Sequence, residues 1–107
     1  MLPKKNRVSS KEVEDIFKRG SYLNSPSLTF KYIRNNAKEA KISFIAPKSV
    51  AKLAVKRNLL RRRGYDAIKK NSDLFPSDLV GVFIYKKSQE DLLMLANEVK
   101  NIFSKIN

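Results

Sequence analysis

The sequence contains no cysteine, no histidine and no tryptophan. Without cysteine there is no disulfide framework, so we expect a cytoplasmic protein. The lack of histidine and cysteine also excludes the usual zinc sites, cysteine nucleophiles and any Ser-His-Asp arrangement. No apolar run approaches the roughly 18 residues of a spanning helix, and residues 1–5 do not resemble the start of a signal peptide. These absences argue against most protein-borne catalysis and against a membrane-spanning role.

Acidic residues are scarce as well. The 107 residues include 10 Asp and Glu against 23 Lys and Arg, which gives a net charge of +13. Such an excess implies a polyanionic partner or surface. A protein nuclease would need clustered carboxylates for two metal ions, but the acids are scattered along the chain with no obvious convergent set. They are Glu12, Glu14, Asp15, Glu39, Asp66, Asp73, Asp78, Glu90, Asp91 and Glu98.

The positive charge is concentrated in one stretch. Between Lys48 and Lys70 there are nine Lys or Arg residues and one acid, Asp66, so this stretch carries eight of the thirteen excess charges. At helical spacing, one side of the stretch is small or apolar and the other is mostly basic. The apolar side holds Leu60, Gly64, Ala67 and Ile68, and the basic side holds Asn58, Arg61, Arg62, Tyr65 and Lys69.

This basic side points to a phosphate-bearing partner. Guanidinium groups suit bidentate contacts with phosphate and stacking. A merely solvated helix face normally mixes charges of both signs, which this one hardly does. We therefore interpret the central helix as a nucleic-acid-binding element that packs on a core through its other side.

The first third of the chain predicts one helix and two short strands. A capping box at Ser9 and Glu12 starts a helix that runs to about Arg19, with Gly20 as its C′ residue. Its apolar stripe includes Phe17, which we assign to the core, with a partly exposed stacking platform as the alternative. Residues 21–27 are rich in turn residues, so any strand there is short or at an edge. Residues 28–33 alternate in polarity and predict a strand with two distinct faces.

The remaining elements follow the same rules. Residues 35–38 are typical of a hairpin loop, and residues 41–46 predict a strand that is stopped by Pro47. Residues 79–85 are apolar on both faces, which is typical of a central strand covered on both sides. Ser88 can cap the last helix, whose apolar stripe predicts a core position.

Together the elements predict a single domain over residues 1–107. The fold class is α/β, in the form of an α+β two-layer sandwich with three helices on a small mixed sheet of about four strands. The expected order is α-β-β-(β)-α-β-α. We expect this single domain to bind a polyanion, and the family resemblance described next implies that the polyanion is RNA.

The central stretch resembles the hallmark of the bacterial ribonuclease P protein subunit. That hallmark is Ala-Val-x-Arg-Asn-Arg-x-Lys-Arg-x-x-Arg, and residues 54–65 read Ala-Val-Lys-Arg-Asn-Leu-Leu-Arg-Arg-Arg-Gly-Tyr. The resemblance covers nearly the whole chain, since the family's Phe-x-x-x-Phe-Lys-x-Gly is echoed by residues 13–20 and its Asp-hydrophobic strand by residues 78–85. Leu59 and Tyr65 replace family arginines, and residues 46–49 read Ala-Pro-Lys-Ser where the family prefers Val-Ser-Lys-Lys.

The resemblance implies a protein cofactor to a catalytic RNA. That RNA, with bound magnesium, hydrolyses the phosphodiester that joins the 5′ leader to mature transfer RNA. The implied partners are the catalytic RNA and precursor tRNA, with no membrane and no obligate protein partner. The protein is expected to supply no catalytic residue and to bind no cofactor firmly. The family also implies a left-handed crossover through the central helix, although general rules favour the right-handed one.

The resemblance and the charge pattern together give two sets of site residues. The expected RNA contacts are Lys48, Lys52, Lys56, Arg57, Asn58, Arg61, Arg62 and Tyr65. The expected leader-binding cleft, between the first helix and the sheet, is lined by Val13, Phe17, Thr29, Lys31 and Ile33. Phe17 suits this role because aromatic stacking tolerates a single strand of any sequence.

Other readings of the sequence remain open. A different RNA-binding protein, such as a ribosomal protein, fits the size and charge equally well, and only the Arg-Asn string with its flanking order of elements favours ribonuclease P. DNA or a membrane surface would also attract the charge. The central helix has too little bulky apolar surface beyond its core side to favour a membrane.

Overall fold

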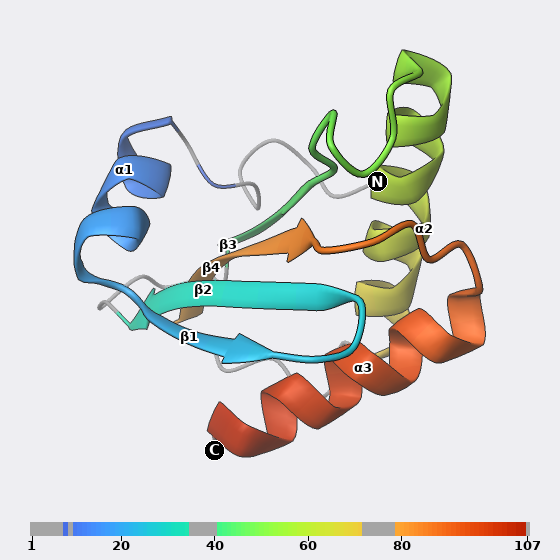
Figure 1. Cartoon of the computed structure of the whole chain (residues 1–107). Coiled ribbons are helices and arrows are strands. Elements are labelled where there is room, and N and C mark those ends of the chain that lie inside the picture. The colour runs from blue at the N-terminus through green and yellow to red at the C-terminus, as the bar shows by residue number, and fades with distance from the viewer. Residues whose placement is uncertain (1–7, 9, 35–40, 72–78, 107) are drawn as a thin grey trace.

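The computed structural model describes residue 8 and residues 10–34, 41–71 and 79–106. They form three helices and a four-stranded mixed sheet (Figure 1), which confirms the predicted fold class. The elements are α1 (Ser10–Arg19), β1 (Ser21–Asn24), β2 (Leu28–Arg34), β3 (Lys41–Ile45), α2 (Ala54–Lys70), β4 (Leu79–Tyr85) and α3 (Leu92–Ile106).

The strands lie in the order β1-β2-β4-β3. β4 is antiparallel to β2 and parallel to β3, and all of its residues except Ile84 are buried, as its apolar sequence predicted. The predicted hairpin loop at residues 35–38 lies outside the described residues. A hairpin between β2 and β3 is nevertheless wrong, because β4 separates these two strands. The left-handedness of the β3–α2–β4 crossover stays a prediction.

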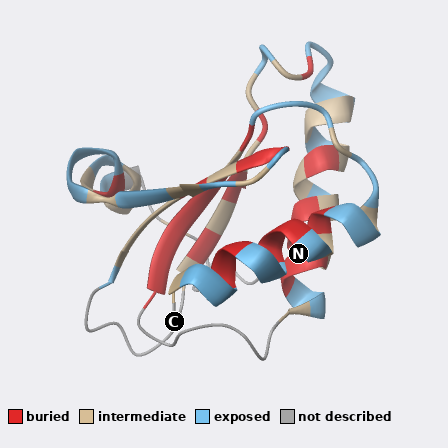
Figure 2. Ribbon diagram, turned by 60° about the horizontal axis from the view of Figure 1, so that its bottom comes forward, coloured by how far each residue is buried: buried red, intermediate tan, exposed pale blue. Residues whose placement is uncertain are grey.

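The helices are divided between the two faces of the sheet. Helices α2 and α3 cover one face, and α1 lies against the other (Figure 2). The α2/α3 side holds the larger core, which is built around stacked aromatic rings. The Phe83 ring lies 4.2 Å from that of Phe30 and 4.8 Å from that of Phe44, and Phe103 of α3 meets Phe83 edge-on at 5.8 Å. These contacts fix α3 and the sheet relative to each other.

The α1 side has a smaller core. Ile16 of α1 is buried together with Val80 and Val82 of β4, and Val13 and Ile33 pack against them half-buried. Because α1 rests on only part of this face, the strand residues beyond it keep some exposure. This face is the predicted location of the leader cleft.

The backbone around Gly20, the residue directly after α1, is packed too closely to admit a side chain. The Gly20 amide donates to the Ile16 carbonyl at 2.7 Å, and a side chain at Gly20 would collide with the carbonyl oxygens of Ile16 and Tyr32. The predicted capping box includes Ser9, which lies outside the described residues. For α3 the predicted cap, Ser88, is wrong, because Asp91 Oδ1 accepts from the amides of the second and third helical residues at 2.9 and 3.1 Å.

A buried carboxylate ties α3 to the turn between β1 and β2. Oε1 of Glu98 accepts from the Ser25 hydroxyl at 2.5 Å and from the Ser27 amide at 2.7 Å. On the same side of the sheet, the Tyr85 hydroxyl donates to the Leu60 carbonyl of α2 at 2.6 Å. These polar contacts hold both helices in register with the strands beneath them.

Candidate nucleic-acid interface

Helix α2 presents a basic surface away from the core. Leu60, Gly64, Ala67 and Ile68 are buried against the sheet and α3, as predicted. On the opposite side Asn58, Arg62 and Lys69 are exposed, and Arg61 is half-buried. The first turn contains no acid. We call Asn58, Arg61, Arg62 and Lys69 the α2 basic surface.

The first turns of α2 hold some of the predicted contact residues in place. The Arg57 guanidinium donates through Nη1 to the carbonyls of Ala51 and Lys52, at 3.0 and 2.7 Å. It therefore closes the segment between β3 and α2 onto the helix and positions Lys52, which is exposed. Arg61 donates to the Asn58 side chain, which orients a guanidinium and an amide together on the α2 basic surface.

The other lysines of the predicted set lie near the amino end of α2. Lys48 is exposed in the segment that leads from β3 to the helix. Lys56 is half-buried and pairs with Glu90 at 2.7 Å, which links α2 to the segment before α3. Both partners of this pair are substantially exposed, so the pair contributes little to stability.

Tyr65 is not part of this surface, and its placement among the RNA contacts is wrong. Only 3% of it is exposed. Its ring meets that of Phe44 edge-on at 5.5 Å, and its hydroxyl accepts from the Phe44 amide at 3.4 Å. Helix α2 leans against β3 on this side, so the buried arc of the helix is wider than the apolar residues alone indicate.

The second candidate surface is the α1 face of the sheet. Phe17 of α1 is 47% exposed, so the core assignment is wrong, and its role as a stacking platform stays a prediction. The Lys31 ammonium lies 4.7 Å from the centre of the Phe17 ring, an arrangement typical of a cation–π contact. Thr29, one alternation away on β2, donates to the Asn24 side chain of β1 at 2.8 Å. Together with half-buried Val13 and Ile33, all five predicted cleft residues border this face.

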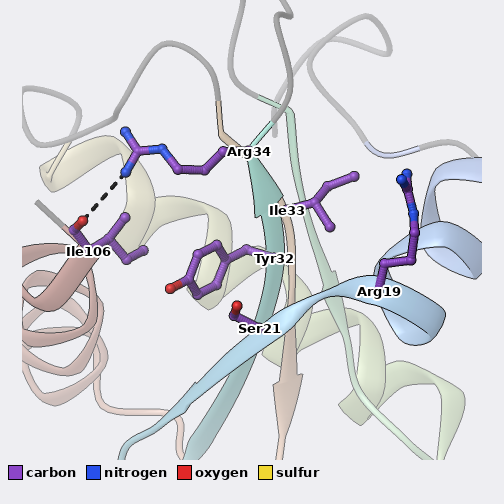
Figure 3. Close-up of a pocket in the computed structure, with 6 residues that line it drawn as sticks. All are labelled: Arg19, Ser21, Tyr32, Ile33, Arg34 and Ile106. Carbon is purple, nitrogen blue, oxygen red and sulfur yellow. Dashed lines mark hydrogen bonds between the residues drawn. The ribbon is translucent and has the colours of Figure 1, made fainter.

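A hollow at the end of β2 borders the α1 face through Ile33 and lies apart from the α2 basic surface. Its volume is about 480 Å³. Arg34 donates through Nη1 to the Ile106 carbonyl at 3.4 Å, and Arg19 lies on the opposite side of β2 (Figure 3). The two guanidinium groups therefore do not converge on a single point. The lining residues are Arg19, Ser21, Tyr32, Ile33, Arg34 and Ile106.

Comparison with known protein families decides between the readings that the charge left open. The family model for Ribonuclease P matches residues 2–107. This chain belongs to the ribonuclease P protein family. A comparison with curated protein sequences gives no significant match. Membership of the family supports a role in tRNA processing within an endoribonuclease complex, and it implies association with the RNA of that complex and with its tRNA substrate.

Solved structures of ribonuclease P proteins share the fold. The RNase P protein from Thermotoga maritima superposes with a TM-score of 0.83 at 18% identity, covering 94% of this chain and 97% of that one. The Staphylococcus aureus RNase P protein gives 0.81 at 14% identity, covering 95% of each chain. A Staphylococcus aureus RNase P protein mutant described as defective in mRNA degradation activity gives 0.82 at 15% identity, covering 96% and 89%. At these identities the likeness concerns the fold alone.

Two lysines that were not predicted from the sequence as contacts lie at the same edge of the sheet as the segment bearing Lys48. Lys86 and Lys87 are exposed directly after β4. Because β3 and β4 are parallel neighbours with Ile45 opposite Ile84, both strands end at the same edge of the sheet. Lys86 and Lys87 therefore lie at the edge from which the segment bearing Lys48 departs. Knowledge of the strand order, which the sequence alone does not show, would have placed these lysines near Lys48.

Among the described residues, no helix is long and apolar enough to cross a membrane.

Proposed function

We propose that this chain is the protein subunit of ribonuclease P, which binds the catalytic RNA and the 5′ leader of precursor tRNA and assists magnesium-dependent removal of that leader. The observation that carries the proposal is the α2 basic surface, on a chain of this family, where three cations and an amide gather on a helix whose first turn has no acid and whose one acid is Asp66. A neutral or mixed-charge face on the same fold would not support RNA binding.

The α2 basic surface suits the backbone of a folded RNA. Arg62 is exposed and Arg61 is already oriented by Asn58, so less side-chain freedom is lost when these groups bind phosphate. Each guanidinium can make two parallel hydrogen bonds to phosphate oxygens. Lys48 and Lys52 extend the positive charge along the segment before the helix, and Arg57 holds that segment in place.

The α1 face suits a single strand. Phe17 offers a ring on which a base can stack, and Lys31 offers a cation to the neighbouring phosphate. Neither group reads base edges, so this surface accepts leaders of any sequence. Ile16 packs against its buried neighbours on β4 and so fixes α1 against the sheet. This packing keeps the Phe17 ring in place.

The chemistry of bond cleavage belongs to the RNA in this proposal. Within residues 8, 10–34, 41–71 and 79–106, no three acidic side chains come together as metal ligands. These residues do not fit the metal centre of a protein nuclease, so we assign the required magnesium to the RNA. The protein residues bind and orient the two RNAs.

The test is cleavage of precursor tRNA by the cognate RNA, with and without the protein, at limiting magnesium. The wild-type protein should restore cleavage. Arg61→Glu with Arg62→Glu should abolish this rescue, whereas the same charge change on α3, Lys100→Glu with Lys105→Glu, should retain it. Equal loss in both variants would mean that the positive charge acts as a diffuse cloud and that the localised site is wrong.

A second arm of the experiment addresses the alternatives. The protein without RNA should cleave neither precursor tRNA nor an mRNA, the substrate named for the Staphylococcus aureus relative. Cleavage that persists through stringent purification would restore the nuclease reading. Tight binding to ribosomal RNA together with failure to rescue tRNA cleavage would favour another RNA-binding role.

A further inference from the structure

An exposed tyrosine on the edge strand lies next to the Phe17–Lys31 pair. Tyr22 of β1 is directly opposite Lys31 of β2 in the antiparallel register. Directly opposite residues of an antiparallel pair point to the same face of the sheet, with their Cβ atoms about 5 Å apart. Tyr22 therefore stands on the α1 face, on the side of Lys31 that is nearer the sheet edge. Phe17, Lys31 and Tyr22 form one row that crosses from α1 over β2 to β1.

The ring of Tyr22 is not used by the fold. It is 65% exposed, more than Phe17 at 47%. In the described part of the chain its ring makes no aromatic contact and its hydroxyl makes no hydrogen bond. The core side of β1 is instead occupied by Leu23, which packs against the main core. Stability therefore gives no reason for a large ring at this position beyond the ordinary preference of strands for tyrosine.

The order of groups in the row suits the chemistry of a single strand. Tyr22 is the strand partner of Lys31, and the Lys31 ammonium contacts the Phe17 ring on its other side at 4.7 Å. Successive bases can stack on successive rings while the phosphate between them meets the cation. The next β1–β2 pair on the same face of the sheet, Asn24 with Thr29, is polar, and its two side chains are joined by a hydrogen bond at 2.8 Å. Tyr22, on the edge strand β1, is therefore the aromatic residue with which the row ends.

We propose that Tyr22 is an additional leader-binding residue, which stacks a base beyond the one held at Phe17 and so extends the bound length of the leader to the edge of the sheet. This inference rests on the proposed function, because it assumes that the leader lies on the α1 face. It adds a residue on β1 to a surface that sequence reasoning limited to α1 and β2.

The experiment measures the affinity of the assembled ribonucleoprotein for precursor tRNAs whose leaders are shortened one nucleotide at a time. In the wild-type complex, affinity should rise with leader length until the row is filled. Tyr22→Ala should remove the gain from the outermost bound nucleotide, about a tenfold loss, and should leave binding of mature tRNA unchanged. Tyr22→Phe should retain the gain, and Tyr22→Leu, which is apolar but cannot stack as a ring, should lose it.

Leu93→Ala is the matched control, because Leu93 is 70% exposed on α3, which covers the opposite face of the sheet. It should bind every leader as the wild type does. The inference is overturned if Tyr22→Ala binds all leaders normally, or if it weakens mature tRNA as strongly as leader-bearing tRNA. A wild-type affinity that is independent of leader length would refute the leader-binding function itself, and the role of Tyr22 with it.

Discussion

Replacing Gly64 by alanine would test how closely α2 is seated on the sheet. A methyl group at this position would lie 2.5 Å from Cδ1 and 2.6 Å from Cε1 of Phe44, well inside the ~3.5–4.0 Å separation of carbon atoms in contact. The Phe44 ring has little room to retreat, because it stacks on Phe83 at 4.8 Å and meets Tyr65 at 5.5 Å. The extra methyl group must therefore displace either the aromatic core or the helix.

Two effects of this substitution oppose each other. Alanine favours a helix over glycine by about 1 kcal/mol, whereas overpacking a core costs ~1–3 kcal/mol. The collision involves a buried ring held between other rings, so we place its cost near the upper end of that range. We expect Gly64→Ala to lower the free energy of unfolding by about 1–2 kcal/mol, measured by urea denaturation.

Two further variants separate the two effects. Asn97→Ala, at an exposed position of α3, should show the gain in helix propensity alone. Phe44→Leu removes ring atoms from the collision, so Gly64→Ala should cost less in that background than in the wild type, a coupling that a double-mutant cycle measures. If Gly64→Ala instead raises the stability of the wild-type protein, the close packing of α2 on Phe44 is refuted.

Three more predictions follow from the same contacts. Leu60→Ala should lower the free energy of unfolding by ~2–5 kcal/mol because Leu60 is fully buried; an unchanged denaturation midpoint would contradict the packing of α2. RNA affinity should fall with salt at a log–log slope of about −0.7 to −0.9 per phosphate contact, and Arg61→Glu with Arg62→Glu should make the slope shallower; a flat wild-type response would remove the electrostatic basis of binding. Burial, and secondly the Glu98 carboxylate, raises the pKa of the Tyr85 phenol above its ordinary value. Since the unfolded phenol ionises first, stability should be intact below about pH 10 and decline above it, and Tyr85→Phe should remove that part of the alkaline decline; an alkaline profile identical to that of the wild type would show that Tyr85 does not cause it.

The positions that face the core followed closely from the sequence. In α2, Leu60 and Ile68 recur at the helical period, and the structure buries both. The continuous apolar run of β4 correctly indicated a central strand, because a strand covered on both faces needs no polar alternation. These signals are local, so a single sequence is enough to detect them.

The pairing of strands could not be derived in the same way. An apolar pattern shows which face of a strand is buried but not which strand lies beside it, so β2 and β3 were assigned to a hairpin although β4 lies between them. For the same reason the sequence did not show that Lys86 and Lys87 lie at the sheet edge next to the segment bearing Lys48, because this placement depends on the parallel pairing of β3 and β4.

The errors at individual side chains also have physical causes. Tyr65 was placed on the outer face by its angle on the helix, but its long ring reaches back to Phe44 once α2 leans on β3. Ser88 is a good capping residue by type, yet the helix begins later and Asp91 caps it. Phe17 was assigned to the core as part of the apolar stripe of the first helix, but Ile16 occupies the buried position beside it.

The order of the strands also has a consequence for how the protein is made. β4 lies in the middle of the sheet but is synthesised after β1, β2, β3 and α2, and β2 and β3 have no bonds to each other without it. On the ribosome, the basic helix therefore emerges before the surface on which it packs is complete. Domains fold as units once their contacts are available, so a nascent chain arrested before Leu79 should be digested by protease as readily as an unfolded one. A chain extended past α3 should resist, and early protection would show that the first three strands fold without their central partner.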